Sequence, residues 1–334
     1  MALLLLSLLT PGCSRQQAAT ASKSRPSYAF ITNGVTNFWD IAAAGAQSAG
    51  NELGVDVTVV MPSSMTDQTR KMEDLLTRGT DGVAISPIDS ANQGDVINKV
   101  AAQTNLITQD SDAPQTDRLV YIGMDNYVAG TMCGKTLRDA LPDGGKIMVF
   151  IGRLDQDNAK RRRQGCIDGF LGRQPDARRN DPAGDVLTSD DGKFTVLGTM
   201  TDQFDRAKAK ANVEDAVTRY SEITAMVGLF DYNPQIILEA LERTGKLGQI
   251  KVMAFDENPV MLQGIKDGTV IGTVVQNPYR YGSESIRMLD ELHKGNRTRI
   301  PADRFINIPA RVINAANVDE FRKETEARLA IVKK

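Results

Sequence analysis

The feature of this sequence that most limits its fold is a regular alternation of short apolar runs with helical segments, from residue 28 to residue 314. Most of the apolar runs are continuous in Val, Ile and Phe, which is typical of strands covered on both faces. Strands that alternate with helices in this way form parallel sheets with helices on both sides. The sequence therefore predicts an α/β protein.

The boundaries of these segments follow from the apolar runs and the breaks between them. We predict strands at residues 28–31, 55–61, 82–86, 105–109, 119–123, 146–152, 194–200, 223–230, 250–255, 270–276 and 305–314. We predict helices from residue 40 and at residues 68–78, 91–103, 127–140, 158–171, 206–219, 234–244, 259–267 and 279–293. So many strands divide more naturally into two doubly wound sheets than into one. The charged tail from Ala315 is predicted to be an exposed helix or a frayed end.

Composition excludes several classes of partner. The 334 residues are 41% hydrophobic and 25% charged, which suits a globular protein of about two domains. A net charge of −2 leaves no basic surface for nucleic acid. The one basic run, Lys160 to Arg163, is interpreted as a solvated helix face. No glycine-rich phosphate-binding pattern opens a helix, so a nucleotide cofactor is not expected.

The first residues indicate export. Residues 1–10 are Leu-rich but too short to span a bilayer, and they are similar to the apolar region of a secretion signal. The stretch from Leu9 to Cys13 looks like a bacterial lipobox, although Thr10 stands where Leu is usual. Residues 1–26 are thus predicted to be a signal, a lipobox with lipidated Cys13, and a polar tether.

The cysteine and histidine residues of this sequence do not form a catalytic pattern. Cys133 and Cys166 each fall in a predicted helix without C-x-x-C spacing, so buried free thiols are favoured and a disulfide stays open. His293, the sole histidine, lies late in a helix, where it complements the helix dipole. The sequence therefore predicts no metal site and no histidine-based catalytic triad.

Two adjacent aromatic residues follow the first predicted strand. Phe38 and Trp39, the only Trp, come after a short polar loop at the carboxyl end of that strand. In open parallel sheets this edge binds ligands, and aromatic faces suit the C–H groups of sugars. The alternative is that both rings fill the core beneath the loop.

Polar side chains also gather where other strands end. For any one of them a helix N-cap or an Asx-turn is the simpler interpretation. Carboxylates and amides can, however, grip the adjacent hydroxyls of a polyol ring, and five such groups beside an aromatic pair favour a carbohydrate pocket. The groups are Asp110-Ser111-Asp112, Asp125-Asn126, Asn233, Asp256-Glu257-Asn258 and Gln276-Asn277-Pro278.

Several short motifs in a fixed order carry a resemblance to a known family. The sequence from Tyr28 to Asn314 resembles the periplasmic sugar-binding proteins of the ribose/galactose-binding type. The motifs are Asn37-Phe38-Trp39, Ile85-Ser86-Pro87 with Asp89-Ser90, Thr108-Gln109-Asp110, Gly123-Met124-Asp125-Asn126, Asn158-Ala159 with Arg162 and Gly165, Gln203-Phe204-Asp205, Asn233, Ala254-Phe255-Asp256 and Val275-Gln276.

The resemblance implies a set of ligand contacts. Stacking on the sugar is implied for Phe38, Trp39 and Phe204, and Asp110 is implied to accept sugar hydroxyls. In ribose binders an Arg follows that acid, whereas Ser111 follows it here, so a pentose contact is missing. The further ligand-binding positions implied are Thr32, Thr36, Lys160, Arg162, Asn233, Asp256 and Gln276.

The resemblance also implies two lobes joined by three hinge crossings, near Met124, Asn277 and Ile308. Residues 27–124 plus 277–307 would form the N-terminal lobe, and residues 125–276 plus 308–334 the C-terminal lobe. Few and short crossings let the lobes rotate and close over a ligand that contacts both of them.

The function predicted is a monomeric solute-binding lipoprotein of the periplasm or cell envelope. It would capture a sugar or polyol and deliver it to the membrane permease of an ABC transporter, without a cofactor. A sensor that presents the same sugar to a receptor or sensor kinase is the alternative. A sugar-modifying enzyme using Asp110, Asp112 and Asp256 as acid and base is less favoured, and a repressor is disfavoured because residues 1–26 contain no helix-turn-helix.

Overall fold

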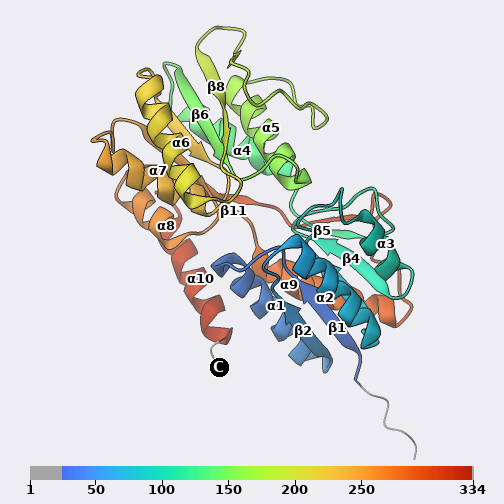
Figure 1. The fold of residues 1–334 in the computed structure, drawn as a ribbon. Helices are drawn as coiled ribbons and strands as arrows, with labels where there is room; N and C mark the ends of the chain where they lie inside the picture. The colour runs from blue at the N-terminus through green and yellow to red at the C-terminus, as the bar shows by residue number, and fades with distance from the viewer. Residues whose placement is uncertain (1–24, 333–334) are drawn as a thin grey trace, which may run out of the picture.

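Two β-sheets, each covered by helices, organise the chain (Figure 1). The computed structural model describes residues 25–332, so the predicted signal and Cys13 lie outside the described residues. The α/β architecture with two parallel-rich sheets is confirmed. Within the described range, no helix has the length and apolar character that crossing a membrane requires.

The first sheet is entirely parallel, in the order β12-β5-β4-β3-β1-β2. Its strands are β1 (Ser27–Ile31), β2 (Asp56–Val60), β3 (Gly82–Ile85), β4 (Asn105–Gln109), β5 (Tyr121–Gly123) and β12 (Phe305–Asn307). Its helices are α1 (Asn37–Leu53), α2 (Met65–Thr77), α3 (Gly94–Ala101) and α9 (Pro278–His293). We call this unit the N-terminal lobe.

The second sheet has the order β13-β11-β10-β9-β6-β8-β7, with antiparallel strands only at its two edges. We call this sheet and its helices the C-terminal lobe. Its strands are β6 (Gly145–Ile151), β7 (Leu187–Thr188), β8 (Phe194–Thr201), β9 (Ala225–Gly228), β10 (Lys251–Phe255), β11 (Val270–Val275) and β13 (Arg311–Asn314). Its helices are α4 (Asn126–Asp139), α5 (Asp157–Leu171), α6 (Arg206–Arg219), α7 (Tyr232–Arg243), α8 (Pro259–Lys266) and α10 (Val318–Val332).

Glycine allows two helices of the C-terminal lobe to approach closely. A Cβ on Gly130 of α4 would stand 2.0 Å from the carbonyl oxygen of Arg162 in α5. A Cβ on Gly165 of α5 would stand equally close, 2.0 Å from the carbonyl oxygen of Tyr127. Because any larger side chain would push the helices apart, these glycines fix where α5 holds Arg162.

The predicted strand at residues 305–314 is wrong, because it is two strands in different sheets. β12 pairs with β5 in the first sheet, and β13 pairs with β11 in the second. Between them the backbone N–H of Ile308 donates to the carbonyl of Gly123 at 2.7 Å. The apolar run continues across this crossing, so periodicity alone could not divide it. The short edge strand β7 was also missed.

The basic run and the C-terminal tail both differ from prediction. Arg163 is buried, not solvated, and its guanidinium donates to Thr199 Oγ1 and to the carbonyls of Asp181 and Pro182. The tail is helical, as α10, but one face of it is packed rather than exposed, since Val318 and Phe321 are buried in the core of the C-terminal lobe.

Candidate functional site

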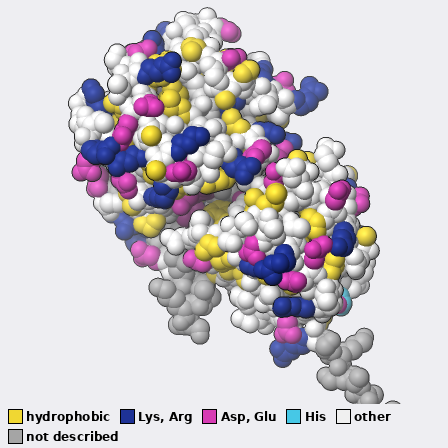
Figure 2. All heavy atoms as spheres, in the orientation of Figure 1, with side chains coloured by type: hydrophobic (Ala, Val, Ile, Leu, Met, Phe, Trp, Pro, Cys, Tyr) yellow, Lys and Arg dark blue, Asp and Glu magenta, His cyan; other side chains and the backbone are white. Residues whose placement is uncertain are grey.

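A cleft of about 600 Å³ lies between the two lobes, where the strands of both sheets end. Figure 2 shows the surface hollowed where the lobes meet, with hydrophobic and acidic side chains in the recess. Eight of the sequence-predicted site residues line this cleft. They are Thr36, Phe38, Trp39, Asp110, Arg162, Phe204, Asp256 and Gln276.

Three other predicted site residues do not line the cleft. Thr32 is buried, with its hydroxyl donating to the carbonyl of Gly34 at 2.7 Å. Lys160 is exposed on α5. Asn233 is buried, and its amide donates to Asp202 at 2.8 Å. These side chains therefore support the surrounding structure or face solvent.

Asp110 comes directly after β4 and is 5% exposed. Its Oδ2 accepts hydrogen bonds from Ser86 Oγ at 2.9 Å and from Asn33 Nδ2 at 3.4 Å. Burial raises the pKa of this carboxyl to about 7, although Arg162 and the bond from Ser86 oppose the rise. Asp110 is thus a buried acid held at the floor of the cleft by its own lobe.

Asp256 comes directly after β10 and is 6% exposed. Its Oδ1 accepts a hydrogen bond from Gln276 Nε2 at 2.8 Å, and Gln276 Oε1 accepts one from Tyr281 at 3.1 Å. Burial raises the pKa of Asp256, while Arg162 and Gln276 oppose the rise. The C-terminal lobe therefore supplies a second buried acid to the same cleft.

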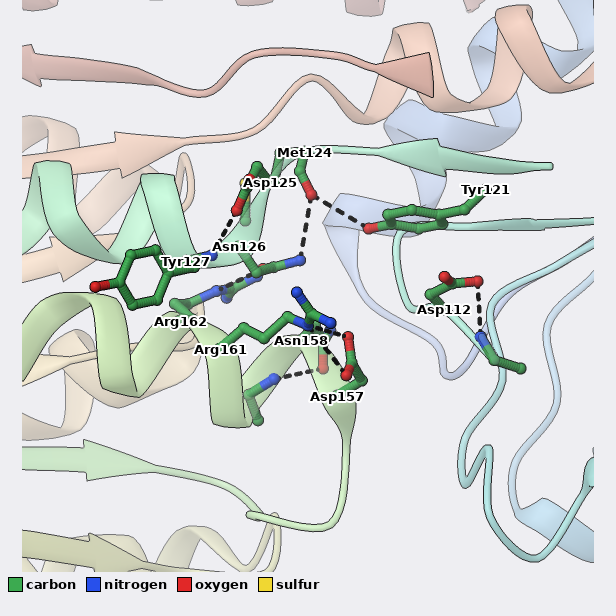
Figure 3. A network of polar contacts seen from close by, with 12 residues as sticks. Asp112, Tyr121, Met124, Asp125, Asn126, Tyr127, Asp157, Asn158, Arg161 and Arg162 are labelled. Atoms are coloured by element: carbon green, nitrogen blue, oxygen red, sulfur yellow. Dashed lines mark hydrogen bonds and ion pairs between the residues drawn. The ribbon is translucent and has the colours of Figure 1, made fainter. Parts of the chain in front are cut away.

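Arg162 lies in the electrostatic field of both acids and is 1% exposed. Its Nε and Nη2 donate to Asn126 Oδ1 at 3.2 and 3.0 Å, and Nη1 donates to the carbonyl of Leu229 at 2.8 Å. The guanidinium lies 4.2 Å from the ring centre of Phe255. Asn126 does not line the cleft, yet it aims the side chain that does (Figure 3).

A chain of hydrogen bonds links the two sides of the cleft through the first crossing. The hydroxyl of Tyr121 donates to the carbonyl of Asp110 at 2.7 Å and to that of Met124 at 3.4 Å. Asn126 Nδ2 donates to the carbonyl of Met124 at 3.5 Å, and Asn126 in turn holds Arg162 (Figure 3). Residues of the crossing thus position charged groups of the site.

Aromatic rings line the cleft from both lobes. Phe38 meets Trp39 edge to face at 4.9 Å, and Trp39 Nε1 donates to Asn33 Oδ1 at 3.1 Å. Phe204 is 47% exposed and stacks on Phe230 at 5.7 Å, with 9° between the ring planes. Trp39 is only 3% exposed, so it both packs in the core and lines the cleft.

Other residues that line the cleft were not predicted from the sequence. Asn33 and Asp231 also follow strands, β1 and β9, and so carry the signal that selected Asp110 and Asp256. After β9 the prediction fell on Asn233 instead, which lies two residues beyond Asp231 in the first turn of α7. The missed lining residues are Asn33, Gly34, Val35, Ser63, Ser64, Ile88, Arg153, Gln156, Asn158, Arg206, Phe230, Asp231 and Tyr232.

Asp112, one of the three acids that a sugar-modifying enzyme would use, does not lie with Asp110 and Asp256 in the cleft. It is paired with Arg118 at 2.6 Å and accepts a hydrogen bond from Thr108 at 2.6 Å, and it does not line the cleft. Among the described residues, no group of three or more His, Cys, Asp or Glu could hold a metal ion. The arrangement is suited to gripping a ligand by hydrogen bonds and ring contacts.

A family model of the periplasmic binding protein domain matches residues 28–297. The chain belongs to the periplasmic binding protein family. This is a family of binding proteins rather than of enzymes. The two lobes with a cleft between them are thus the fold of a periplasmic binding protein.

Characterised relatives cover most of this periplasmic binding protein. The ribose import binding protein of Salmonella typhimurium is 25% identical over 258 residues, which are 76% of this chain and 80% of the relative. The D-allose-binding periplasmic protein of Escherichia coli is 21% identical over 299 residues, 86% of this chain and 90% of the relative.

A solved structure shares the same fold. It is an ABC transporter solute-binding protein of Burkholderia graminis in complex with D-arabinose, 25% identical, with a TM-score of 0.78. The match covers 89% of this chain and 97% of that chain.

Proposed function

We propose that this protein captures a sugar or polyol between its lobes and delivers it to the membrane permease of an ABC importer. One observation carries the proposal. Two buried carboxylates, Asp110 from one lobe and Asp256 from the other, flank the buried guanidinium of Arg162 in a single cleft. Such a set accepts and donates hydrogen bonds in pairs, as neighbouring hydroxyls require.

The unused carboxylate oxygens of the two acids support this proposal. Asp110 uses Oδ2 for its hydrogen bonds and Asp256 uses Oδ1, which leaves the second oxygen of each for ligand hydroxyls. Aromatic rings from the two lobes supply apolar faces beside these acids. The relatives named above bind or import ribose and allose, and the solved structure contains D-arabinose.

Closure of the lobes would signal that ligand is bound. We propose that residues 27–124 plus 277–307 move against residues 125–276 plus 308–334, as a monomer, about the three crossings. A contact between the lobes already exists, since Gln156 Nε2 donates to the carbonyl of Ile88 at 3.1 Å. A ligand that contacts both lobes favours the closed state, which a permease can distinguish from the open one.

The proposal includes anchoring of the protein in the cell envelope through lipidated Cys13. It rests on the stretch from Leu9 to Cys13, which lies outside the described residues. Intact-mass analysis of the protein purified from bacterial membranes tests it. A diacylglyceryl mass on Cys13, lost in a Cys13→Ser variant, supports the anchor, and a mature chain that begins elsewhere overturns it.

A thermal-shift screen over pentoses, hexoses, inositols and amino sugars tests the binding function. A compound that binds only the folded state raises the melting temperature, and isothermal titration then gives its dissociation constant. We expect at least one sugar or polyol to bind with micromolar affinity or better. The proposal is overturned when no compound in the panel shifts the melting temperature.

A further inference from the structure

Three aromatic rings of the C-terminal lobe line the cleft together. They belong to Phe204, Phe230 and Tyr232, and we call them the aromatic wall. The ring of Phe204 stacks on that of Phe230, and its centre lies 6.2 Å from the centre of the Tyr232 ring. The rings close over Gly152, where a Cβ would stand 2.8 Å from Phe204 and 2.9 Å from both other side chains. The wall is therefore packed from behind, while Phe204 stays 47% exposed.

The backbone that carries Phe204 is strained. Gln203 and Phe204 both have a left-handed backbone, with φ of 59° and 64°. A bulky residue such as Phe rarely adopts this conformation, which persists only where the surrounding structure holds it. The N–H of Gln203 donates to the carbonyl of Gly152 at 2.8 Å, and the N–H of Phe204 donates to Asp202 Oδ1 at 2.8 Å. The Asp202 carboxylate thus holds the strained residue from which the exposed ring projects.

The Asp202 carboxylate is fixed in turn by the segment that follows β9. Asp202 is 1% exposed and does not line the cleft. Its Oδ1 also accepts a hydrogen bond from the hydroxyl of Tyr232, and its Oδ2 accepts one from Asn233 Nδ2 at 2.8 Å. Asn233 Oδ1 accepts from the N–H of Phe230 at 3.2 Å. One network therefore connects Asp202 to every residue of the aromatic wall.

We propose that Asp202 is a positioning residue that holds the Phe204 ring against the bound sugar or polyol. The inference rests on the proposed function and adds a residue that sets affinity from behind the cleft. A ring that is fixed before binding loses little freedom when the ligand docks, so preorganisation strengthens binding. Without the Asp202 carboxylate, the turn at Gln203 and Phe204 would relax toward an unstrained backbone, and the ring would leave its place on Phe230.

Isothermal titration of an Asp202→Asn variant tests the proposal. The probe is the compound of the thermal-shift panel that binds the wild type most tightly. An amide has a single oxygen, so it cannot accept from Phe204 and Tyr232 on one side and from Asn233 on the other. We expect the dissociation constant to rise about three- to tenfold, the range of an aromatic contact. Asp215→Asn, at an exposed position of α6, is the matched control and keeps the wild-type value.

The outcomes separate this inference from the proposed function. An Asp202→Asn variant that binds the probe as tightly as the wild type overturns the inference and leaves the proposed function standing. Absence of binding by the wild type to every compound of the panel overturns both.

A double-mutant cycle distinguishes positioning of the ring from a general loss of stability. Phe204→Asn removes the ring, and Asn tolerates the left-handed φ at this position. If Asp202 acts through the ring, Asp202→Asn should change the dissociation constant by less than about twofold in the Phe204→Asn background. An equal loss of affinity with and without the Phe204 ring overturns the positioning role.

An exchange of donor and acceptor tests the same role in a chain that keeps its charge. In the double variant Asp202→Asn with Asn233→Asp, the new amide can donate to the new carboxylate and still accept from Phe204 and Tyr232. We expect this variant to fold even where Asp202→Asn alone does not, and to bind within about twofold of the wild type. A folded double variant that binds about tenfold more weakly than the wild type, or worse, overturns the inference.

Discussion

Asp110 and Asp256 occupy equivalent positions in the two lobes. Each directly follows a strand in the interior of its sheet, and each has a left-handed backbone, with φ of 58° and 68°. The backbone carbonyl of each accepts a hydrogen bond of 2.7 Å from a hydroxyl on the neighbouring strand, from Tyr121 for Asp110 and from Thr273 for Asp256. The two sheets therefore present their acids to the cleft with the same local geometry.

This geometry decides which substitutions are informative. Left-handed φ is strained for most side chains but is tolerated by Asn and Asp. A change to Ala would add backbone strain to the loss of the carboxylate, whereas a change to Asn removes the charge alone. We therefore use Asn at both positions.

Asp256→Asn should weaken ligand binding. A charged acceptor buried opposite a ligand donor contributes about 1.5–3 kcal/mol, so the dissociation constant should rise roughly tenfold to a hundredfold. Isothermal titration with the tightest ligand from the screen measures it. Asp267→Asn, at the exposed C-cap of α8, is the matched control. An unchanged dissociation constant in Asp256→Asn would show that Asp256 does not contact the ligand.

Asp110 should make the ligand-free protein less stable as pH rises. Its pKa in the folded state is about 7, above the value of about 4 in an unfolded chain, so the folded state binds the proton more tightly between those values. The free energy of unfolding should therefore fall from about pH 4 to pH 7 and then level off.

Asp110→Asn removes this contribution. At pH 8 the variant should be more stable than the wild type, by on the order of 2–4 kcal/mol, and the difference should shrink toward pH 5. Urea unfolding at both pH values measures it. If the variant is destabilised equally at both pH values, then burial of the ionised Asp110 carboxylate does not lower the free energy of unfolding of the wild type.

Asn126→Ala should weaken binding although Asn126 does not line the cleft. The substitution removes the oxygen that accepts from two nitrogens of Arg162, so the guanidinium loses its orientation. We expect an increase in the dissociation constant of about tenfold, since a hydrogen bond to a charged group contributes about 1.5–3 kcal/mol. Asn212→Ala, which removes a bond to the carbonyl of Thr201, should leave the affinity unchanged. Equal affinities in wild type and Asn126→Ala would exclude this positioning role.

The single Trp should report ligand binding. Trp39 lines the cleft and donates to Asn33, which also contacts Asp110, so a ligand at Asp110 changes the surroundings of the indole. Titration with ligand should change the intrinsic fluorescence until it saturates. The dissociation constant from this curve should equal the one measured by calorimetry. Trp39→Phe should abolish the signal. A constant emission at saturating ligand would place the ligand away from Trp39.

Cys133 and Cys166 should remain free thiols that react slowly in the folded protein. Both are fully buried, their sulfur atoms lie 4.0 Å apart, and the neighbouring Cys166 together with burial raises the pKa of Cys133. In a Cys13→Ser variant, thiol titration should detect two thiol groups in denaturant. The same reagent should react far more slowly with the native protein. Finding none in denaturant would reveal a disulfide.

The sequence determined the α/β class, most elements and the acids at the strand ends. Continuous apolar runs identify buried strands, and a polar residue directly after such a run marks the edge where ligands bind, which is how Asp110 and Asp256 were found. Asp231 carries the same signal, because it directly follows the strand predicted at residues 223–230, but the prediction selected Asn233, which lies in the first turn of α7.

Only the tertiary structure decided which polar side chains face the cleft and what holds them. Arg162 and Arg163 are adjacent in sequence, yet one lines the cleft and the other is held by the carbonyls of a distant loop. Asn126 became a positioning residue because glycines bring α4 and α5 into contact. Such pairings depend on how the helices and sheets pack across long separations in the chain, whereas local periodicity reports only the face on which a residue lies.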